Sequence, residues 1–136
     1  MLRQLTTGIA LFVVAVAASP AIHAGQARSA SQGVYTAAQA TRGEAAFKDK
    51  CAPCHGEMLE GVVGPPLTGD EFLKAWAGQP LSELVNKIQK TMPQNDPGSL
   101  TRAESLDLVA HILRVGKFPA GNAELPAADA DRKSVV

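Results

Sequence analysis

The chain has 136 residues, with 13 basic and 13 acidic side chains, so its formal net charge is zero. This balance argues against nucleic acid as a partner and gives no strong field to steer a charged partner over a long range. The length suffices for one domain and is too short for two.

Residues 1–24 have the pattern of an export signal. Arg3 lies near the start, and an apolar run extends from Ile9 to Ala18. The run is too short to span a bilayer, so we expect a signal peptide cleaved before Gly25 and a periplasmic location for the rest. A retained N-terminal anchor is the alternative, because Ile22 stands where the cleavage site usually has alanine. The exported chain would have 112 residues and a net charge near −1.

The first predicted element is a helix from residue 36 to about residue 50. Thr36 with Gln39, and Thr41 with Glu44, have the spacing at which a side chain and a backbone amide cap each other at a helix start. The sequence therefore predicts that helix begins at or soon after Thr36.

This helix leads into Cys51-Ala52-Pro53-Cys54-His55. Two residues between the cysteines let both sulfurs reach the two vinyl-derived carbons on one edge of a porphyrin, and the next residue then lies under the iron. The spacing predicts one haem c, attached covalently through Cys51 and Cys54, with an axial nitrogen from His55. A structural zinc site is one alternative, but it needs four ligands and the exported chain adds only His111. A thioredoxin-like dithiol is another, but it expects a βαβ context and the surroundings are helical.

Glycine and proline exclude regular structure from the loop that follows, through Gly69. We expect Asp70 to cap a short helix that Gly78 ends, and Pro80 to begin a longer helix. Four apolar residues of the longer helix recur at helical spacing and predict a core-facing side: Leu81, Leu84, Val85 and Ile88.

Two prolines and a glycine exclude helix from Thr91-Met92-Pro93-Gln94-Asn95-Asp96-Pro97-Gly98. Thr101 with Glu104 opens the last helix, which Gly116 ends. The apolar residues of this helix should face inward: Leu108, Val109, Ile112 and Leu113. These elements predict an all-α fold of about four helices around one haem.

The chain has no internal repeat and no second haem motif. It divides into a signal peptide (1–24), a flexible lead-in (25–35), one domain (36–118) and a tail (119–136). Aromatic residues are scarce, so the core has little bulk, and a buried porphyrin would supply it.

From about Thr36 to Val115 the chain resembles the class I cytochrome c family, which carries one haem. Gly43, Phe47 and Cys51 reproduce the spacing of a glycine, an aromatic residue and the first cysteine in the family's N-terminal helix. The resemblance implies the small cytochrome c fold, in which the N- and C-terminal helices cross at this glycine. His111 departs from the family, which usually has an aromatic residue there, so the predicted helix contact is weaker.

The resemblance also implies further cofactor contacts. Gly64-Pro65 resembles the family's loop proline, whose carbonyl accepts a hydrogen bond from the far nitrogen of His55 and fixes the ring. Met92-Pro93 resembles the distal ligand motif, so the expected iron ligands are His55 and Met92. Trp76 is similar to a tryptophan that donates its indole hydrogen to a haem propionate, and a simple core role fits it equally.

Chemistry also favours Met92 as a ligand. A thioether is a neutral, soft donor that favours ferrous iron and so raises the potential of the couple. The alternative role for Met92 is to fill a gap in the core. Met58 is too close to His55 in sequence to reach the opposite haem face, and His111 is the rival sixth ligand, with helix packing as its alternative role.

The stretch from Met92 to Leu125 is also similar, more loosely, to the cytochrome domains found with quinoprotein alcohol dehydrogenases. The similar peptides are Pro-Gly-Ser-Leu after the methionine and Phe118-Pro-Ala-Gly near the end. This resemblance implies a class of partner, a dehydrogenase whose reduced quinone cofactor passes on electrons one at a time.

Together these features predict an exported electron carrier and not an enzyme, because ligation on both haem faces keeps substrates from the iron. We expect a monomer or complex subunit that passes electrons from a periplasmic dehydrogenase or respiratory complex to a terminal acceptor such as an oxidase. It would meet the membrane only through partner complexes. Partners should dock over less than about 1,200 Å² near Ala52, Pro53, Val62, Val63 and Pro93. The alternatives are a haem-bearing subunit of a dehydrogenase or oxidase complex, and a haem sensor or peroxidase with a labile sixth ligand.

Overall fold

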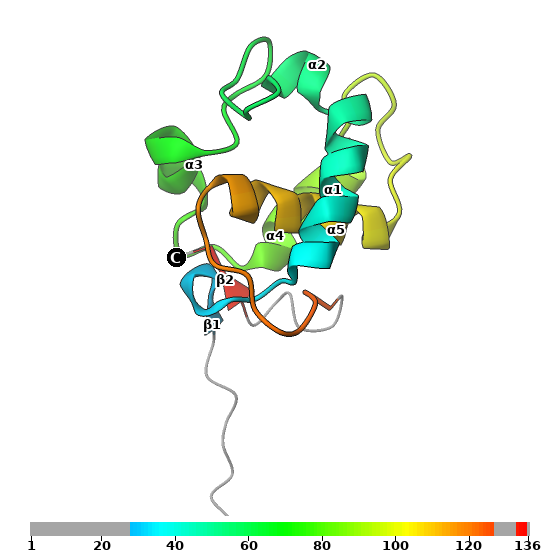
Figure 1. Ribbon diagram of the computed structural model, residues 1–136. Coiled ribbons are helices and arrows are strands. Elements are labelled where there is room, and N and C mark those ends of the chain that lie inside the picture. The colour runs from blue at the N-terminus through cyan, green and yellow to red at the C-terminus, as the bar shows by residue number, and fades with distance from the viewer. Residues whose placement is uncertain (1–27, 127–132, 136) are drawn as a thin grey trace, which may run out of the picture.

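The computed structural model describes residues 28–126 and 133–135, so the predicted signal peptide at residues 1–24 lies outside the described residues. Helices dominate the structure (Figure 1). In chain order the elements are β1 (Arg28–Ser29), the 3₁₀-helix η1 (Ala30–Gln32), α1 (Ala37–Lys50), α2 (Ala52–His55), α3 (Gly69–Trp76), α4 (Leu81–Thr91), α5 (Arg102–Val115) and β2 (Lys133–Ser134). The described part thus has five α-helices where about four were expected, and it confirms the all-α class.

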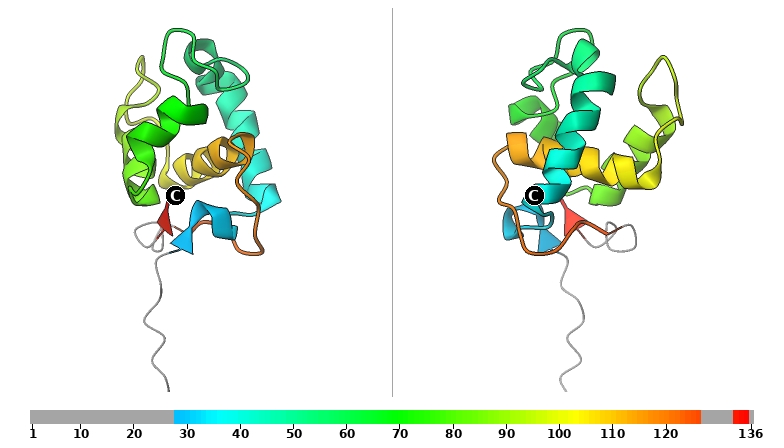
Figure 2. Two further views of the ribbon diagram at one scale, coloured as in Figure 1. Left: turned by 90° about the vertical axis from the view of Figure 1, so that its left-hand side faces the viewer. Right: turned by 45° about the vertical axis from the view of Figure 1, so that its right-hand side comes forward.

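Helices α1 and α5 cross (Figures 1 and 2), and Gly43 of α1 lies at the contact. A Cβ atom at Gly43 would collide with the backbone carbonyl of Asp107 and would lie 3.0 Å from the Cβ of His111. The two helix backbones therefore approach as closely as only glycine allows. This confirms the predicted crossing and explains why α1 tolerates a residue that costs about 1 kcal/mol of helix propensity.

The core forms where α5 packs between α1 and α4 (Figure 2). The predicted core faces of α4 and α5 are both buried. Each of the eight predicted residues is at most 8% exposed: Leu81, Leu84, Val85, Ile88, Leu108, Val109, Ile112 and Leu113. Full burial of such a side chain contributes about 1.5–3 kcal/mol, so these two faces supply much of the domain's stability.

Side chains cap the two long helices as the sequence predicts. The Oγ1 atom of Thr36 accepts a hydrogen bond from the backbone amide of Gln39 at 3.1 Å. At the start of α5, Thr101 and Glu104 form a reciprocal capping box. Each cap pairs a backbone donor that the helix itself leaves unpaired.

Three residues lie at other positions relative to the helix ends than the sequence predicts. α3 begins at Gly69 after Thr68, so Asp70 lies in its first turn, where a carboxylate faces the positive end of the helix dipole. Thr41 lies inside α1 and its hydroxyl donates to the carbonyl of Ala37, because the helix has already begun. Thr91 is the last residue of α4, since a proline restricts only the residue directly before it.

On both sides of the predicted domain, described residues of the expected flexible lead-in (25–35) and tail (119–136) are packed, while residues 25–27, 127–132 and 136 lie outside the described residues. Tyr35 is 1% exposed, and its hydroxyl donates to the carbonyl of Phe118 at 2.7 Å. β1 and β2 form a short parallel ladder, and Val135 after β2 is fully buried. Small and polar residues suggested flexibility, but Arg28 and Ser29 pair with Lys133 and Ser134, which are distant in the sequence.

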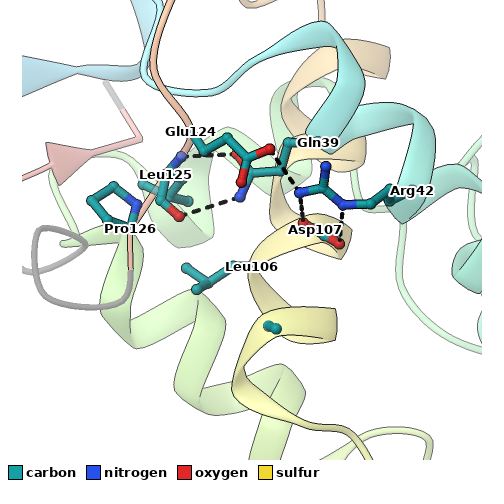
Figure 3. A pocket seen from close by; sticks show the side chains of 8 residues that line it. Gln39, Arg42, Leu106, Asp107, Glu124, Leu125 and Pro126 are labelled. Carbon is teal, nitrogen blue, oxygen red and sulfur yellow. Dashed lines mark hydrogen bonds and ion pairs between the residues drawn. The ribbon is translucent and has the colours of Figure 1, made fainter.

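Side chains of α1 hold residues 117–126, here called the C-terminal strap (Figure 3). The buried Gln39 amide donates to the carbonyl of Leu125 at 3.2 Å and accepts from its backbone N–H at 2.8 Å. Arg42 reaches Glu124 at 2.9 Å, but both side chains are about half exposed, so solvent and salt screen this ion pair. The Gln39 bonds are therefore the stronger attachment.

Replacement of Gly43 by alanine should lower the free energy of unfolding by about 1–3 kcal/mol, because the new methyl group overpacks the helix crossing. Chemical denaturation of the purified protein, followed by far-ultraviolet circular dichroism, measures the change.

The matched control is Ala45→Gly at an exposed position of the same helix, which should cost only about 1 kcal/mol of helix propensity. Propensity alone predicts that Gly43→Ala is stabilising. A stabilised Gly43→Ala variant would therefore contradict the close crossing.

Lastly, no helix among the described residues combines the length and the apolar character needed to cross a membrane.

Candidate functional site

The two cysteines and His55 lie on one helical turn that continues from α1. Cys51 ends α1, with its backbone amide donating to the carbonyl of Phe47 at 2.9 Å. The Cys51 carbonyl then accepts from the amides of Cys54 at 3.1 Å and His55 at 2.9 Å. This turn fixes the spacing of the two sulfurs and the imidazole. Because α1 carries the turn, the α1–α5 crossing also fixes its position.

The His55 ring is held by a hydrogen bond on its far side. Its Nδ1 atom lies 2.8 Å from the carbonyl oxygen of Pro65, the contact that the sequence predicted. A carbonyl only accepts, so Nδ1 carries the proton and the Nε2 lone pair is left for a metal. His55 is 8% exposed, and a Cβ atom at Gly64 would lie 2.8 Å from its Cε1. Gly64 is therefore a positioning residue, because only glycine fits against the ring.

The loop after α2 is bound to the same turn by its backbone. The carbonyl of Cys54 accepts hydrogen bonds from three successive amides, those of Val62 at 3.2 Å, Val63 at 3.0 Å and Gly64 at 2.8 Å. These bonds bring residues 62–64 back against the cysteine turn. They also place Pro65 within reach of His55.

Leu59 anchors the inside of this loop. It is fully buried with a φ of 62°, in the left-handed region that a leucine rarely adopts. Its carbonyl accepts from the amide of Leu67 at 2.9 Å. No sequence pattern predicts the burial of Leu59, because a single apolar residue in a glycine- and proline-rich stretch has no periodicity.

The two thiols differ in environment. Cys54 is exposed and Cys51 is partly buried. Burial raises the pKa of the Cys51 thiol to about 11, with a smaller opposing effect of Lys50. Since the thiolate is the reactive form in disulfide exchange, Cys51 stays a thiol at neutral pH and resists oxidation.

The donor set fits haem c. Two thiols and a free imidazole nitrogen lie on one turn, with the imidazole oriented by Pro65 and Gly64. Within the described residues no three His, Cys, Asp or Glu side chains gather as they do around a metal ion held by protein ligands alone.

Met92 follows the last residue of α4 in extended backbone, with φ −120° and ψ 151°, as the following proline predicts. Its amide donates to the carbonyl of Ile88 at 3.0 Å, and its side chain is half-buried. The structure thus places Met92 at the point where the chain leaves α4. Ligation of iron by Met92 stays a prediction.

Trp76 is the last residue of α3 and is half-buried. Its ring lies 6.5 Å from that of Phe72, centroid to centroid, and it lines a surface hollow together with Lys87 and Lys90. Both the core role and the propionate role remain open predictions for this indole.

His111 packs in the α1–α5 crossing. Its ring lies 5.1 Å from that of Phe47, and its Nδ1 atom lies 3.1 Å from a guanidinium nitrogen of Arg114. A guanidinium only donates, so Nδ1 accepts and the ring is neutral. These contacts support the packing role and not the rival ligand role.

The protonation of His111 is coupled to this packing. Burial, and next the positive charge of Arg114, lower the pKa of His111 to about 4. Lys48 on α1 acts in the same direction, whereas Glu44 on α1 opposes the shift. Protonated His111 is therefore disfavoured in the folded protein.

Comparisons with known proteins agree with this site. Residues 38–112 match the family model described as cytochrome c oxidase, cbb3-type, subunit III. The chain is 32% identical over 68 residues to a cytochrome c-553-like protein of Synechocystis sp., a match that covers 50% of this chain and 64% of that protein.

Among solved structures, this protein is similar to a chain in the crystal structure of the sulfane dehydrogenase SoxCD from Paracoccus pantotrophus. The TM-score is 0.50 at 20% identity, and the match covers 82% of this chain and 61% of that chain. At this identity the likeness shows the fold alone. The match spans less than two thirds of the length of either relative.

The lowered pKa of His111 predicts acid-sensitive stability. The folded-state pKa lies below the value of 6.5 expected for the unfolded chain, so stability is fully present above pH 6.5 and is lost as the pH falls toward 4. Between pH 7 and pH 5 the free energy of unfolding should fall by about 2 kcal/mol. Chemical denaturation at the two pH values measures the loss.

The control is His111→Phe, which keeps a ring against Phe47 but cannot titrate. It should remove most of this pH dependence, because unperturbed carboxylates stay ionised down to about pH 5. An equal pH dependence in the variant would show that His111 is not the titrating group.

Proposed function

The chain belongs to the cytochrome c family described as cytochrome c oxidase, cbb3-type, subunit III, and on this basis we propose that it is an exported monohaem carrier of single electrons. The observation that carries the proposal is the hydrogen bond from His55 to Pro65, which leaves Nε2 free beside two cysteines on one turn. A haem c bound there supplies an iron that alternates between the ferrous and ferric states.

The residues around the site keep the imidazole fixed during this change of charge. Pro65 holds Nδ1 of His55, and Gly64 packs against the ring. Met92 would supply a thioether as the second iron ligand, which would keep substrates from the iron. Ligation on both faces requires little rearrangement in each transfer and distinguishes a carrier from a catalyst.

Partners dock on the loop that is bound to the cysteine turn. Val62 and Val63 are 69% and 83% exposed, yet their amides are fixed to the carbonyl of Cys54. An exposed apolar surface within a few residues of the attachment cysteines suits a brief redox encounter, with an interface below about 1,200 Å². Val62 and Val63 are two of the five residues of the predicted docking face, which also includes Ala52, Pro53 and Pro93.

The donor is a periplasmic dehydrogenase, such as a quinoprotein dehydrogenase, or a respiratory complex, and the acceptor is an oxidase. These partners rest on the sequence resemblance and on the export signal at residues 1–24. The family's description as an oxidase subunit supports an alternative, in which the chain does the same chemistry as a bound subunit.

Gel filtration of an extract from the native cells, followed by haem absorbance, distinguishes the two forms. A free carrier elutes at the size of one chain. A subunit elutes in a larger assembly that survives dilution.

Replacement of Met92 by alanine should remove the weak ferric iron–thioether absorption band and let the reduced protein bind carbon monoxide. It should also lower the reduction potential, because the soft thioether that favours ferrous iron is lost. Visible spectroscopy and redox potentiometry measure these changes.

The matched control is Met58→Ala, which removes the other methionine of the exported chain, a side chain 71% exposed. It should keep the thioether band. If the band survives in Met92→Ala and disappears in Met58→Ala, the proposed ligand assignment is wrong.

Replacement of Val62 by lysine should slow electron transfer to a purified redox partner about tenfold, because a charge in the interface costs about 1.4 kcal/mol or more. The visible spectrum should not change. The control Ala123→Lys adds the same charge at an exposed position of the C-terminal strap. Equal rates in the parent and both variants would exclude this docking face.

A further inference from the structure

The loop after α2 has three large apolar side chains that are exposed, here called the apolar patch: Met58 (71%), Val62 (69%) and Val63 (83%). The backbone under the patch is fixed. Two of its amides donate to the carbonyl of Cys54, and the amide of Met58 donates to the carboxylate of Glu60 at 2.9 Å. The loop between α2 and α3 that carries the patch lies at one end of the molecule (Figure 1). A rigid apolar surface of this kind fits an apolar counterpart.

The charge around the patch has one sign. Between Cys51 and Gly69, the turn and loop that carry the patch, the chain has two carboxylates and no lysine or arginine. Both are exposed: Glu57 and Glu60. Glu57 directly precedes Met58, and the bond from the Met58 amide holds the Glu60 carboxylate beside the patch. The rim of the patch is therefore acidic, although the whole chain is neutral.

Lysines near the end of α1 do not cancel this charge, because each is paired with a carboxylate. Lys48 lies 2.7 Å from Glu44, and Lys50 lies 3.2 Å from Glu104. The next lysine after the loop is Lys74, which lies on α3 together with Asp70 and Glu71. Lys87 and Lys90 lie on α4 beside Trp76. At physiological salt the Debye length is about 8 Å, so a docking partner responds to the local charge more than to the net charge.

We propose that the redox partner of this protein presents an apolar face rimmed by lysine or arginine to the apolar patch. This inference rests on the proposed function and adds the chemistry of the partner. Opposite charges at the rim raise the rate of encounter and orient the pair, while the apolar contact holds it briefly.

Two oxidants of opposite charge test the proposal on the haem-loaded protein. Tris(phenanthroline)cobalt(III) is an apolar cation, and hexacyanoferrate(III) is a polar anion. Each takes one electron from the ferrous iron, which becomes ferric. Raising the ionic strength from about 0.01 M to about 0.15 M shortens the Debye length from about 30 Å to about 8 Å. The rate with the cobalt complex should fall and the rate with hexacyanoferrate should rise.

Variants separate the local charge from the net charge. Glu57→Gln should slow the cobalt reaction about twofold to fivefold at low salt, as Coulomb's law gives for one charge about 10 Å from a trivalent cation. Glu83→Gln changes the net charge equally but lies on α4, so its effect should be smaller. Val63→Ser should slow only the cobalt reaction, because it removes apolar contact and no charge.

Three results would overturn the proposal: salt effects of the opposite sign, no salt effect with either oxidant, or equal effects of Glu57→Gln and Glu83→Gln. In each case the protein still transfers electrons, so the proposed function stands. Failure of that function would appear differently, as a reduced iron that reacts with neither oxidant.

Discussion

The hydrogen bond between Nδ1 of His55 and the carbonyl of Pro65 is the contact on which the chemistry of the site depends. It assigns the proton to one ring nitrogen and leaves the other for a metal. The bond forms because three amides of the loop converge on the carbonyl of Cys54 and bring Pro65 back over the imidazole. One short loop thereby orients the proposed ligand and presents the apolar patch.

The turn that carries Cys51, Cys54 and His55 is also held in place by helix α1. α1 carries Cys51 at its end, and the contact of α1 with α5 at Gly43 sets its position. The C-terminal strap adds a second attachment through the amide of Gln39. The site is therefore built at the end of a braced helix. This suits a carrier, in which the ligands should move little between redox states.

Periodic and capping signals predicted the helical frame well. Leu84 and Val85 reveal a core face by their spacing, and Thr101 with Glu104 marks a helix start. The packing of Tyr35 and the strap was missed, because it depends on single backbone bonds between distant segments that leave no pattern in sequence. The attachment turn could be predicted, since covalent chemistry fixes its spacing. Ligation by Met92 stays a prediction, because the following proline determines the extended backbone at Met92 but not the contacts of its thioether.

The central claim is that His55 and Met92 close both faces of one haem iron. Visible spectra of the oxidised and reduced protein, made in a strain able to attach haem, test it most directly when carbon monoxide is then added to the reduced form. The account predicts a c-type spectrum with a weak ferric iron–thioether band and no response to carbon monoxide. Rapid binding of carbon monoxide would contradict it, because it would reveal an open or labile sixth site and favour a sensor or enzyme over a carrier.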